Sequence, residues 1–351
     1  MSIPSIDFSP IYSEDKEAIK DLVNQVRNAC LDKGFFQLVG HHVEPDLQEN
    51  ILNYSSKFFK LSPEDKLKVS KSNNSYNRGY ETVGSQSFEK NQTPDIKEGI
   101  YFGGEIPLDH PLFGKINCGP NQWPELIEGS KEEAANFQKA VMDYREQVLK
   151  LGTLVLKVIA LGLGCDETFF DDFLVDPIAI VRLLHYPKKD FVSESDRGIG
   201  AHTDFGAITL LLQSDVSGLQ VMEEETGEWI DIPPNKGAYV VNLGDMMQMW
   251  SNDKYHSNIH RVMNIPGKER FSIPFFVNGN PNFEIKCLPS CEDEDGSAKY
   301  PVVTVNDYIQ RKYDQSYNLA IATPPNASDI IATPPNASDI IATLENVSIT
   351  A

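Results

Sequence analysis

Basic residues are scarce in this chain of 351 residues: 31 Lys and Arg stand against 51 Asp and Glu, a formal net charge of −20. A surface with that charge repels phosphate backbones, so we expect no nucleic-acid partner. The chain also lacks an uninterrupted apolar run of the roughly 20 residues that a membrane helix needs, so we expect no membrane partner. Its first residues are acidic and lack the basic and apolar regions of a signal peptide.

Cysteine is sparse as well. An odd, scattered set of cysteines is typical of reduced thiols and not of a disulfide framework, so it predicts a cytoplasmic protein. The apolar fraction of 40% is ordinary for a globular protein and sufficient for a substantial core. The cysteines are Cys30, Cys118, Cys165, Cys287 and Cys291.

The first half of the chain has helical patterns separated by short strands and loops. Ser13 is a candidate N-cap for the first helix, with Glu14 and Asp15 in its first turn, and Gly34 ends it. Apolar periodicity and turn residues predict the remaining elements. These are a strand at 35–39, helices at 46–60 and from Ser62, long loops at 72–125, the longest helix at 131–162 and, near the other end of the chain, a helix at 304–317.

Short β-type runs separated by polar turns follow the longest helix. Regular short strands of this kind predict an antiparallel sandwich or barrel, mainly β, with helices packed outside it. Asp245 follows one such run and is interpreted as a turn residue that supports a strand end. The runs occupy residues 179–186, 207–213, 219–222, 229–232, 238–243 and 271–276.

A perfect tandem repeat marks the end of the sequence: IATPPNASDI occupies 321–330 and again 331–340. A ten-residue unit with little apolar surface cannot form a packed core, so we expect a disordered extension. The chain is therefore divided into an N-terminal helix and strand region (1–125), a β region with its preceding long helix (126–317) and a repeated tail (318–351).

A candidate metal site lies at His202-Thr203-Asp204. In an extended chain residues i and i+2 project from the same face, so His202 and Asp204 can both face one metal ion. His260, which begins another β-type run, is the candidate third ligand. Two histidines and one carboxylate form the face that leaves positions open on non-haem iron(II).

Arg270 and Ser272 follow ten and twelve residues after His260, again spaced to share one face of a strand. A guanidinium binds a carboxylate through two hydrogen bonds, and a hydroxyl adds a third. A dicarboxylate that chelates iron at one end needs such a partner at the other. A histidine and an aspartate alone would be weak support, but the ordered set of five residues predicts an iron and 2-oxoglutarate site.

These motifs resemble the 2-oxoglutarate and iron(II)-dependent dioxygenase superfamily, and within it the isopenicillin N synthase-like branch. The resemblance covers roughly residues 3–315 and implies a distorted double-stranded β-helix, or jelly roll, flanked by helices. Residues 94–103 are most similar to those of fungal and microbial members that resemble thymine dioxygenase or ethylene-forming proteins. The matching segments are IPSIDFS (3–9), CLDKGFFQLVGHHV (30–43), HTDFGAITLLLQ (202–213), GLQV (218–221), VVNLGDMMQMWSND (240–253), HRV (260–262) and RFSIPFF (270–276).

The resemblance also implies further binding residues. Tyr186 matches a family tyrosine that contacts the cosubstrate, whereas Leu184 stands where many plant members carry Asn. Arg78 and Tyr80 lie in the region that covers the barrel mouth in the family, where they either contact substrate or hold the loop in place. Tyr101 and Phe276 are candidates for the pocket lining or, alternatively, ordinary core aromatics.

The sequence thus predicts an oxidoreductase, with iron(II), 2-oxoglutarate and O2 as cofactors and ascorbate as a reductant. It would oxidise, by hydroxylation or demethylation, a small molecule such as a nucleobase or a secondary metabolite and release succinate and CO2. A second hypothesis is an iron oxidase or cyclase without 2-oxoglutarate, in which Arg270 and Ser272 hold a substrate carboxylate. A third is a catalytically silent binding protein on the same scaffold.

Overall fold

The computed structural model describes residues 2–86, 95–190 and 197–316 of the chain. The repeated tail of the sequence therefore lies outside the described residues. Among the helices in the described ranges, none is long and apolar enough to cross a membrane.

Fourteen strands in the described residues form three sheets. The largest has eight strands in the order β1-β2-β10-β7-β12-β5-β4-β3, the second has the order β6-β11-β8-β9, and β13 pairs with β14. The strands are β1 (Ser5–Asp7), β2 (Phe35–Val39), β3 (Gly79–Glu81), β4 (Glu98–Phe102), β5 (Ile178–Tyr186), β6 (Arg197–His202), β7 (Ile208–Gln213), β8 (Leu219–Met222), β9 (Trp229–Asp231), β10 (Tyr239–Leu243), β11 (His260–Met263), β12 (Arg270–Gly279), β13 (Glu284–Ile285) and β14 (Val303–Thr304).

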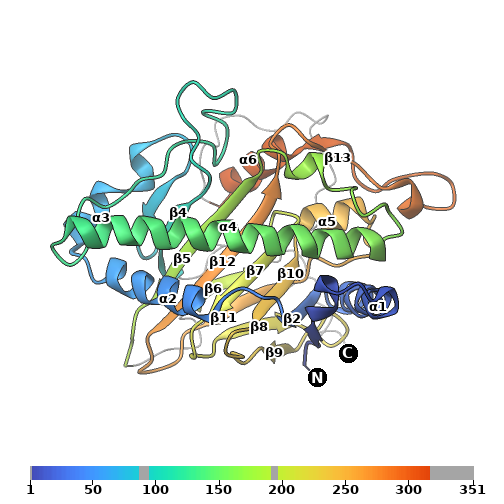
Figure 1. Cartoon of the computed structure of the whole chain (residues 1–351), viewed down its shortest axis with the longest axis horizontal. Coiled ribbons are helices and arrows are strands. Elements are labelled where there is room, and N and C mark those ends of the chain that lie inside the picture. The colour runs from blue at the N-terminus through green and yellow to red at the C-terminus, as the bar shows by residue number, and fades with distance from the viewer. Residues whose placement is uncertain (1, 87–94, 191–196, 317–351) are drawn as a thin grey trace, which may run out of the picture.

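Helices cover one face of the eight-stranded sheet (Figure 1). The longest, α4, crosses the strands β5, β12, β7 and β10, with α1 and α2 beside it. Ser130 caps α4 by accepting a hydrogen bond from the N–H of Glu133 at 3.2 Å. The α-helices are α1 (Lys16–Asp32), α2 (Pro45–Phe59), α3 (Pro63–Lys68), α4 (Lys131–Gly162), α5 (Asp245–Trp250) and α6 (Val305–Ser316), with short 3-10 helices at Ser9–Tyr12, Lys71–Asn73, Asp172–Leu174 and Pro289–Cys291.

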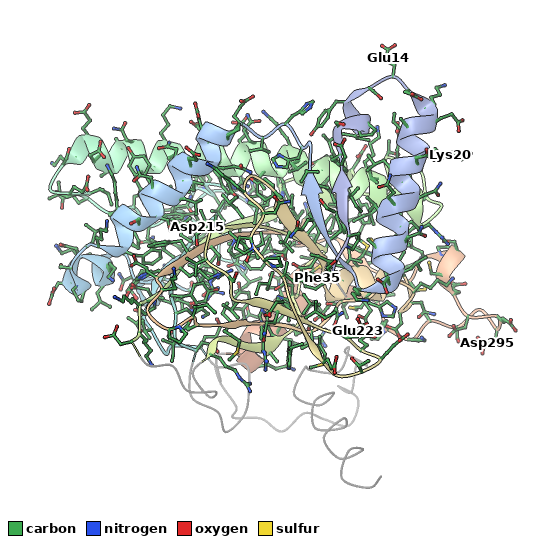
Figure 2. All side chains as sticks on the ribbon, turned by 90° about the horizontal axis from the view of Figure 1, so that it is seen from below. Glu14, Lys20, Phe35, Asp215, Glu223 and Asp295 are labelled. Carbon is green, nitrogen blue, oxygen red and sulfur yellow. The ribbon has the colours of Figure 1, made fainter. Side chains whose placement is uncertain are left out.

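The space between the eight-stranded and four-stranded sheets is where the functional residues gather. Strand β5 is buried over its whole length, because α4 covers one of its faces and the smaller sheet lies opposite the other. Figure 2 shows the same division: Phe35 lies inside the molecule, whereas Glu14, Lys20 and Asp295 lie at its periphery. This mainly β architecture with flanking helices is the jelly-roll fold that the sequence predicted.

Most elements expected from the sequence are confirmed, three expectations are wrong, and some strands were not expected. The first helix is capped by Asp15 and not by Ser13, since the Asp15 carboxylate accepts from the N–H of Glu17 and of Ala18. The region 72–125 contains β3 and β4 and is not loop throughout. The sequence also missed β6. Asp245 begins helix α5 and is not a turn residue at a strand end.

Candidate active site

The structure brings His202, Asp204 and His260 together between the two sheets. His202 is the last residue of β6 and His260 the first of β11, and the two lie directly opposite each other in the antiparallel ladder. Asp204 lies past the end of β6, in the loop to β7. Oδ1 of Asp204 is 3.8 Å from Nε2 of each histidine. All three ligand atoms lie within 4.8 Å of one another, close enough for one metal ion.

The neighbours of these side chains leave the right atoms available to a metal. Nδ1 of His202 donates to the carbonyl oxygen of Gly200 at 2.8 Å, and Nδ1 of His260 donates to the carbonyl oxygen of Asn258 at 3.2 Å. Each Nε2 then carries a lone pair and faces Asp204. The donor set therefore fits a divalent metal bound by two imidazoles and one carboxylate.

Hydrogen bonds also fix the carboxylate. Oδ2 of Asp204 accepts from the Thr209 hydroxyl at 2.6 Å and from the Asn242 amide at 2.7 Å, so Oδ1 is the oxygen that faces the histidines. Burial alone would raise the pKa of the Asp204 carboxyl. The two histidines and these two hydrogen bonds lower it by more, so the net effect is a lowered pKa. Burial and the neighbouring His260 lower the pKa of His202 to about 3. Near neutral pH the site therefore offers a carboxylate and a neutral imidazole, the forms that bind metals.

The first turn of α5 holds the loop that carries Asp204. The N–H of Asp245 donates to the Asp204 carbonyl oxygen at 2.8 Å, and the N–H of Gly244 donates to the Ala207 carbonyl oxygen at 3.0 Å. The approach is so close that a Cβ on Gly244 would lie 2.2 Å from the carbonyl oxygen of Gly206. Glycine at 244 is therefore needed to let helix and loop meet.

We expect Gly244→Ala to disrupt the metal site. Its methyl group would also lie 2.9 Å from the Asp204 carbonyl oxygen, so the loop must move, at a cost of about 1–3 kcal/mol. Cobalt(II) titration followed by absorbance should show at least a tenfold weaker affinity, together with a lower Tm. The matched control is Gly104→Ala, whose methyl would meet only the flexible end of Arg145 at 3.1 Å. Unchanged cobalt(II) affinity in Gly244→Ala would contradict this role of the glycine.

A first cavity, of about 500 Å³ with part of it open to solvent, runs from the three candidate ligands to Arg270. Arg270 is the first residue of β12, and Nη2 donates to Oε1 of Gln213 at 2.8 Å while Nε donates to the Val216 carbonyl at 3.2 Å. Its guanidinium lies over the Tyr186 ring, 4.8 Å from the centroid. The Ser272 hydroxyl donates to the Tyr186 hydroxyl at 3.4 Å.

Arg270 retains an unused donor. Its side chain is buried, and burial lowers the pKa of its guanidinium. Nη1 has no hydrogen-bond partner within the described residues. A buried donor without a partner is costly, and a carboxylate entering the cavity would satisfy it with a charge-assisted bond. The residues present therefore fit a dicarboxylate cosubstrate that reaches from the metal to Arg270.

Leu184 lines this first cavity together with Tyr186. It lies opposite Ser272 in the ladder between β5 and β12. The Leu side chain makes this wall of the cavity apolar. At the Arg270 end of this cavity, the polar side chains of the lining are Arg270, Ser272 and Tyr186, and Gln213 holds the Arg270 guanidinium without lining the cavity itself.

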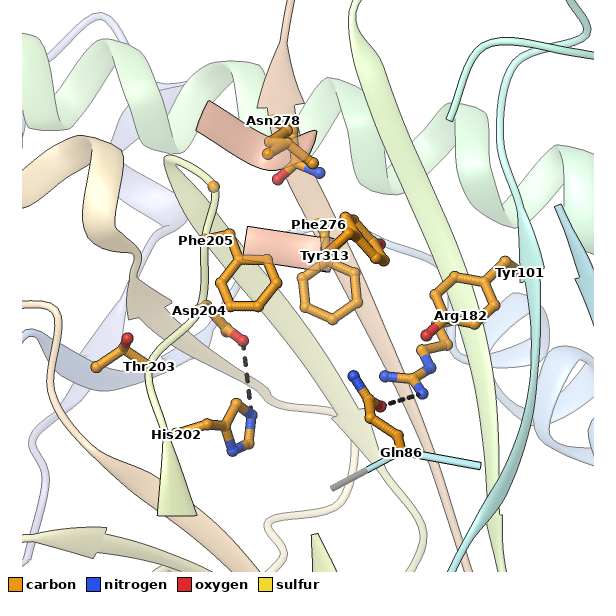
Figure 3. A pocket seen from close by; sticks show the side chains of 12 residues that line it. Gln86, Tyr101, Arg182, His202, Thr203, Asp204, Phe205, Phe276, Asn278 and Tyr313 are labelled. Atoms are coloured by element: carbon orange, nitrogen blue, oxygen red, sulfur yellow. Dashed lines mark hydrogen bonds and ion pairs between the residues drawn. The ribbon is translucent and has the colours of Figure 1, made fainter. Parts of the chain in front are cut away.

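A second cavity, also of about 500 Å³ and partly open to solvent, meets the first at the candidate ligands His202 and Asp204 (Figure 3). His202, Asp204, Arg182 and Phe276 line both cavities. The remaining lining is mostly aromatic and amide side chains, with two residues from helix α6. It consists of Gln86, Tyr101, Thr203, Phe205, Gly206, Asn278, Ile309 and Tyr313.

The four residues predicted to face the substrate divide into two pairs. Tyr101 and Phe276 line the second cavity. Arg78 does not line either cavity: it is buried, donates to Oδ1 of Asn121 at 3.1 Å and to the carbonyl of Asn117, and so holds its own loop. Tyr80 is also outside both linings, and its hydroxyl donates to Oε2 of Glu98 at 2.5 Å.

Arg182 is the lining residue that sequence reasoning should have found. It lies on β5 at i−2 from Leu184 and i−4 from Tyr186, so strand alternation places all three on one face. Asn242 had a signal too, since it is a polar residue inside an apolar run that became the buried strand β10. Phe205 and Tyr313 gave no such signal, because their position depends on how loop and helix pack. Asn278 lies two residues after Phe276 on β12, so strand alternation places the two side chains on one face.

Known proteins share this fold and these motifs. Residues 3–126 match the family described as the N-terminal region of non-haem dioxygenases of morphine synthesis, and residues 177–279 match the 2OG-Fe(II) oxygenase superfamily. The 2-oxoglutarate-Fe(II) type oxidoreductase hxnY of Emericella nidulans is 48% identical, over 91% of each chain. The 2-oxoglutarate-dependent dioxygenase citB of Monascus ruber is 40% identical, over 91% of this chain and 97% of its own.

A solved structure has the same fold as this chain. A full-length protein from Neurospora crassa, crystallised in complex with alpha-KG, superposes with a TM-score of 0.79 at 32% identity, covering 89% of this chain and 96% of that one. A jelly roll with two histidines and a carboxylate between its sheets defines a class of non-haem iron enzymes. This chain belongs to the 2OG-Fe(II) oxygenase superfamily. It is an iron(II) and 2-oxoglutarate-dependent dioxygenase, as the sequence predicted.

Proposed function

We propose that His202, Asp204 and His260 bind the catalytic iron(II). The support is their geometry: two Nε2 atoms and one Oδ1 face a common point, and each side chain is held from behind by a hydrogen bond. Bound iron supplies the activation of O2 that organic side chains cannot provide. The protein supplies the orientation of the ligands and an enclosed site.

We propose that Arg270, Ser272 and Tyr186 bind the distal carboxylate of 2-oxoglutarate. The unpartnered Nη1 of Arg270 supports this role, and Gln213 keeps the guanidinium pointed along the cavity. In the overall reaction, 2-oxoglutarate and O2 convert a substrate C–H into C–OH, giving succinate and CO2. One oxygen atom enters the product and the other enters succinate, so the atoms balance.

The substrate, we infer, is a small planar ring compound with hydrogen-bonding groups, and it is hydroxylated. The observation that carries this inference is the second cavity, which adjoins the metal ligands and is lined by four aromatic rings with two amides, Gln86 and Asn278. Aromatic walls favour flat ligands by stacking. The Neurospora crassa protein of similar fold has also been crystallised with alpha-KG and thymine.

A matched substrate screen tests this proposal. Purified protein with iron(II), 2-oxoglutarate and ascorbate is offered free nucleobases and other planar heterocycles, alongside aliphatic acids and amides of equal size. We expect at least one planar compound to stimulate succinate release about tenfold or more, in proportion to a hydroxylated product. Stimulation by aliphatic compounds alone would overturn the inferred substrate class. Product formation without 2-oxoglutarate would favour the oxidase or cyclase alternative.

We further propose that the chain belongs to the isopenicillin N synthase-like branch and works in a reducing compartment such as the cytoplasm. The N-terminal match over residues 3–126 supports the branch and the boundary near residue 125. All five cysteines are free thiols, which fits a reducing compartment. The net charge of −20 supports a small-molecule substrate over nucleic acid.

A further inference from the structure

Asp245 is a buried carboxylate that no step of the proposed reaction uses. It begins helix α5 and is completely buried. Its side chain accepts three hydrogen bonds or ion-pair contacts: from the Ser257 hydroxyl at 2.8 Å, from the Tyr308 hydroxyl at 2.8 Å and from Nζ of Lys312 at 2.9 Å. A charge at this depth requires such compensation, so its partners are fixed with it.

The backbone N–H of Asp245 and one of these side-chain contacts reach the segments that carry the proposed metal ligands. The N–H of Asp245 donates to the carbonyl oxygen of Asp204 at 2.8 Å. Its carboxylate holds Ser257, which lies three residues before His260. One residue therefore fixes the backbone at the aspartate ligand and the chain leading to the second histidine.

The other contacts belong to helix α6. Tyr308 and Lys312 are spaced i, i+4, so they project from one face of the helix onto Asp245. Burial and the Asp245 charge raise the pKa of Tyr308, so its hydroxyl stays a donor. The residues that follow each of them, Ile309 and Tyr313, line the second cavity.

Helix α6 also touches the residue next to the metal ligand. The Tyr313 ring packs edge-on against Phe205, with centroids 5.9 Å apart. Nζ of Lys312 lies 5.4 Å from the centroid of the same Phe205 ring. Figure 3 shows Phe205 and Tyr313 side by side above Asp204. Docking of α6 and the position of the Asp204 loop are therefore joined through both Asp245 and Phe205.

We propose that Asp245 is a positioning residue that couples docking of α6 to metal binding. The proposal rests on the metal ligands assigned under the proposed function. A docked α6 keeps the Asp204 and His260 segments in the geometry that the metal needs. Binding linkage is reciprocal, so a bound metal must strengthen the docking of α6 by the same factor. Metal loading would then complete the α6 wall of the substrate cavity before substrate enters.

Lys312→Met tests the coupling without touching either cavity. The variant removes the charged link from α6 to Asp245, and we expect the Kd for cobalt(II), measured by absorbance titration, to rise about tenfold, as for residues behind metal ligands. In the unaltered protein, saturating cobalt(II) should slow hydrogen exchange of the α6 amides about tenfold, because local opening of α6 would weaken metal binding and is therefore opposed by the bound metal. In Lys312→Met the metal should slow that exchange less than about twofold.

Lys66→Met is the matched control. Lys66 also forms a buried ion pair, with Glu98 at 2.7 Å, but on helix α3. Lys66→Met should lower Tm while leaving unchanged both the cobalt(II) affinity and the slowing of α6 hydrogen exchange by the metal. If Lys312→Met does not fold, Tyr308→Phe removes the second link with no charge left unpaired, and about a threefold change in the same direction is expected.

The outcomes separate the two proposals. If cobalt(II) does not bind the unaltered protein in a manner that depends on Asp204, the proposed function fails. If it binds but α6 exchange does not respond, the coupling fails and the proposed function stands. Equal effects from Lys66→Met and Lys312→Met would also overturn the coupling, because they would reflect general destabilisation.

Discussion

Asp204→Ala is expected to abolish 2-oxoglutarate turnover, by about a thousandfold or more. In the proposed site the carboxylate would supply the single anionic ligand, and its loss would leave two imidazoles that cannot hold iron(II) in the required geometry. A thousandfold loss corresponds to about 4 kcal/mol, within the several kcal/mol that a bound metal contributes. The measurement is succinate formation with saturating iron(II) and 2-oxoglutarate, with cobalt(II) titration beside it.

Two further variants test whether the loss of turnover comes from the loss of a correctly placed carboxylate. Asp204→Glu keeps the charge but moves the carboxylate away from Thr209 and Asn242, which now orient it, so turnover should fall at least about tenfold. Asp231→Ala is the matched control: Asp231 is exposed on β9, and its loss should leave turnover within about twofold. Full activity in Asp204→Ala would refute the ligand assignment.

The sequence could single out His202, Asp204 and His260, which the structure brings together, because their signal is local and chemical. A histidine and an aspartate two residues apart, followed by a second histidine in a β-type run, restrict the possible chemistry to few classes. What the sequence lacked was the register. His202 and His260 meet because β6 and β11 pair directly at those two residues. Neither segment alone shows that it pairs with the other, because the two are far apart in the chain.

The missed elements share a physical reason. Strand β6 reads RGIGAH, with two glycines and little β propensity, and it is extended because β11 pairs with it. Strand β3 has three residues and depends on β4 beside it. Tertiary pairing outweighs local preference in both, so a pattern along the chain could not reveal them.

Asp245 shows the same limit at the level of function. Its helix has six residues, too short for apolar periodicity to register. Its partner Tyr308 lies 63 residues further along the chain. A carboxylate after a β-type run resembles a turn residue until those distant partners are known, and the coupling proposed for it could come only from the packed structure.

Arg270→Met is expected to raise the KM for 2-oxoglutarate about a hundredfold while leaving cobalt(II) affinity within about twofold. The substitution removes the charge-assisted bonds that the guanidinium would give to the distal carboxylate, each worth about 1.5–3 kcal/mol. Arg270 contacts Gln213, Val216 and Tyr186 but none of the three ligands. Succinate formation over a range of 2-oxoglutarate concentrations gives KM.

Comparison with two other arginine variants makes the result specific. Arg270→Lys keeps a charge but loses the fork that binds both carboxylate oxygens, so KM should rise about tenfold. Arg261→Met removes a half-buried guanidinium that stacks on Trp229 at 3.9 Å, outside the first cavity, and should leave KM unchanged. If Arg270→Met kept an unaltered KM for 2-oxoglutarate, the cosubstrate could not lie along this cavity. Arg270 and Ser272 would then be free to hold a carboxylate of the substrate instead.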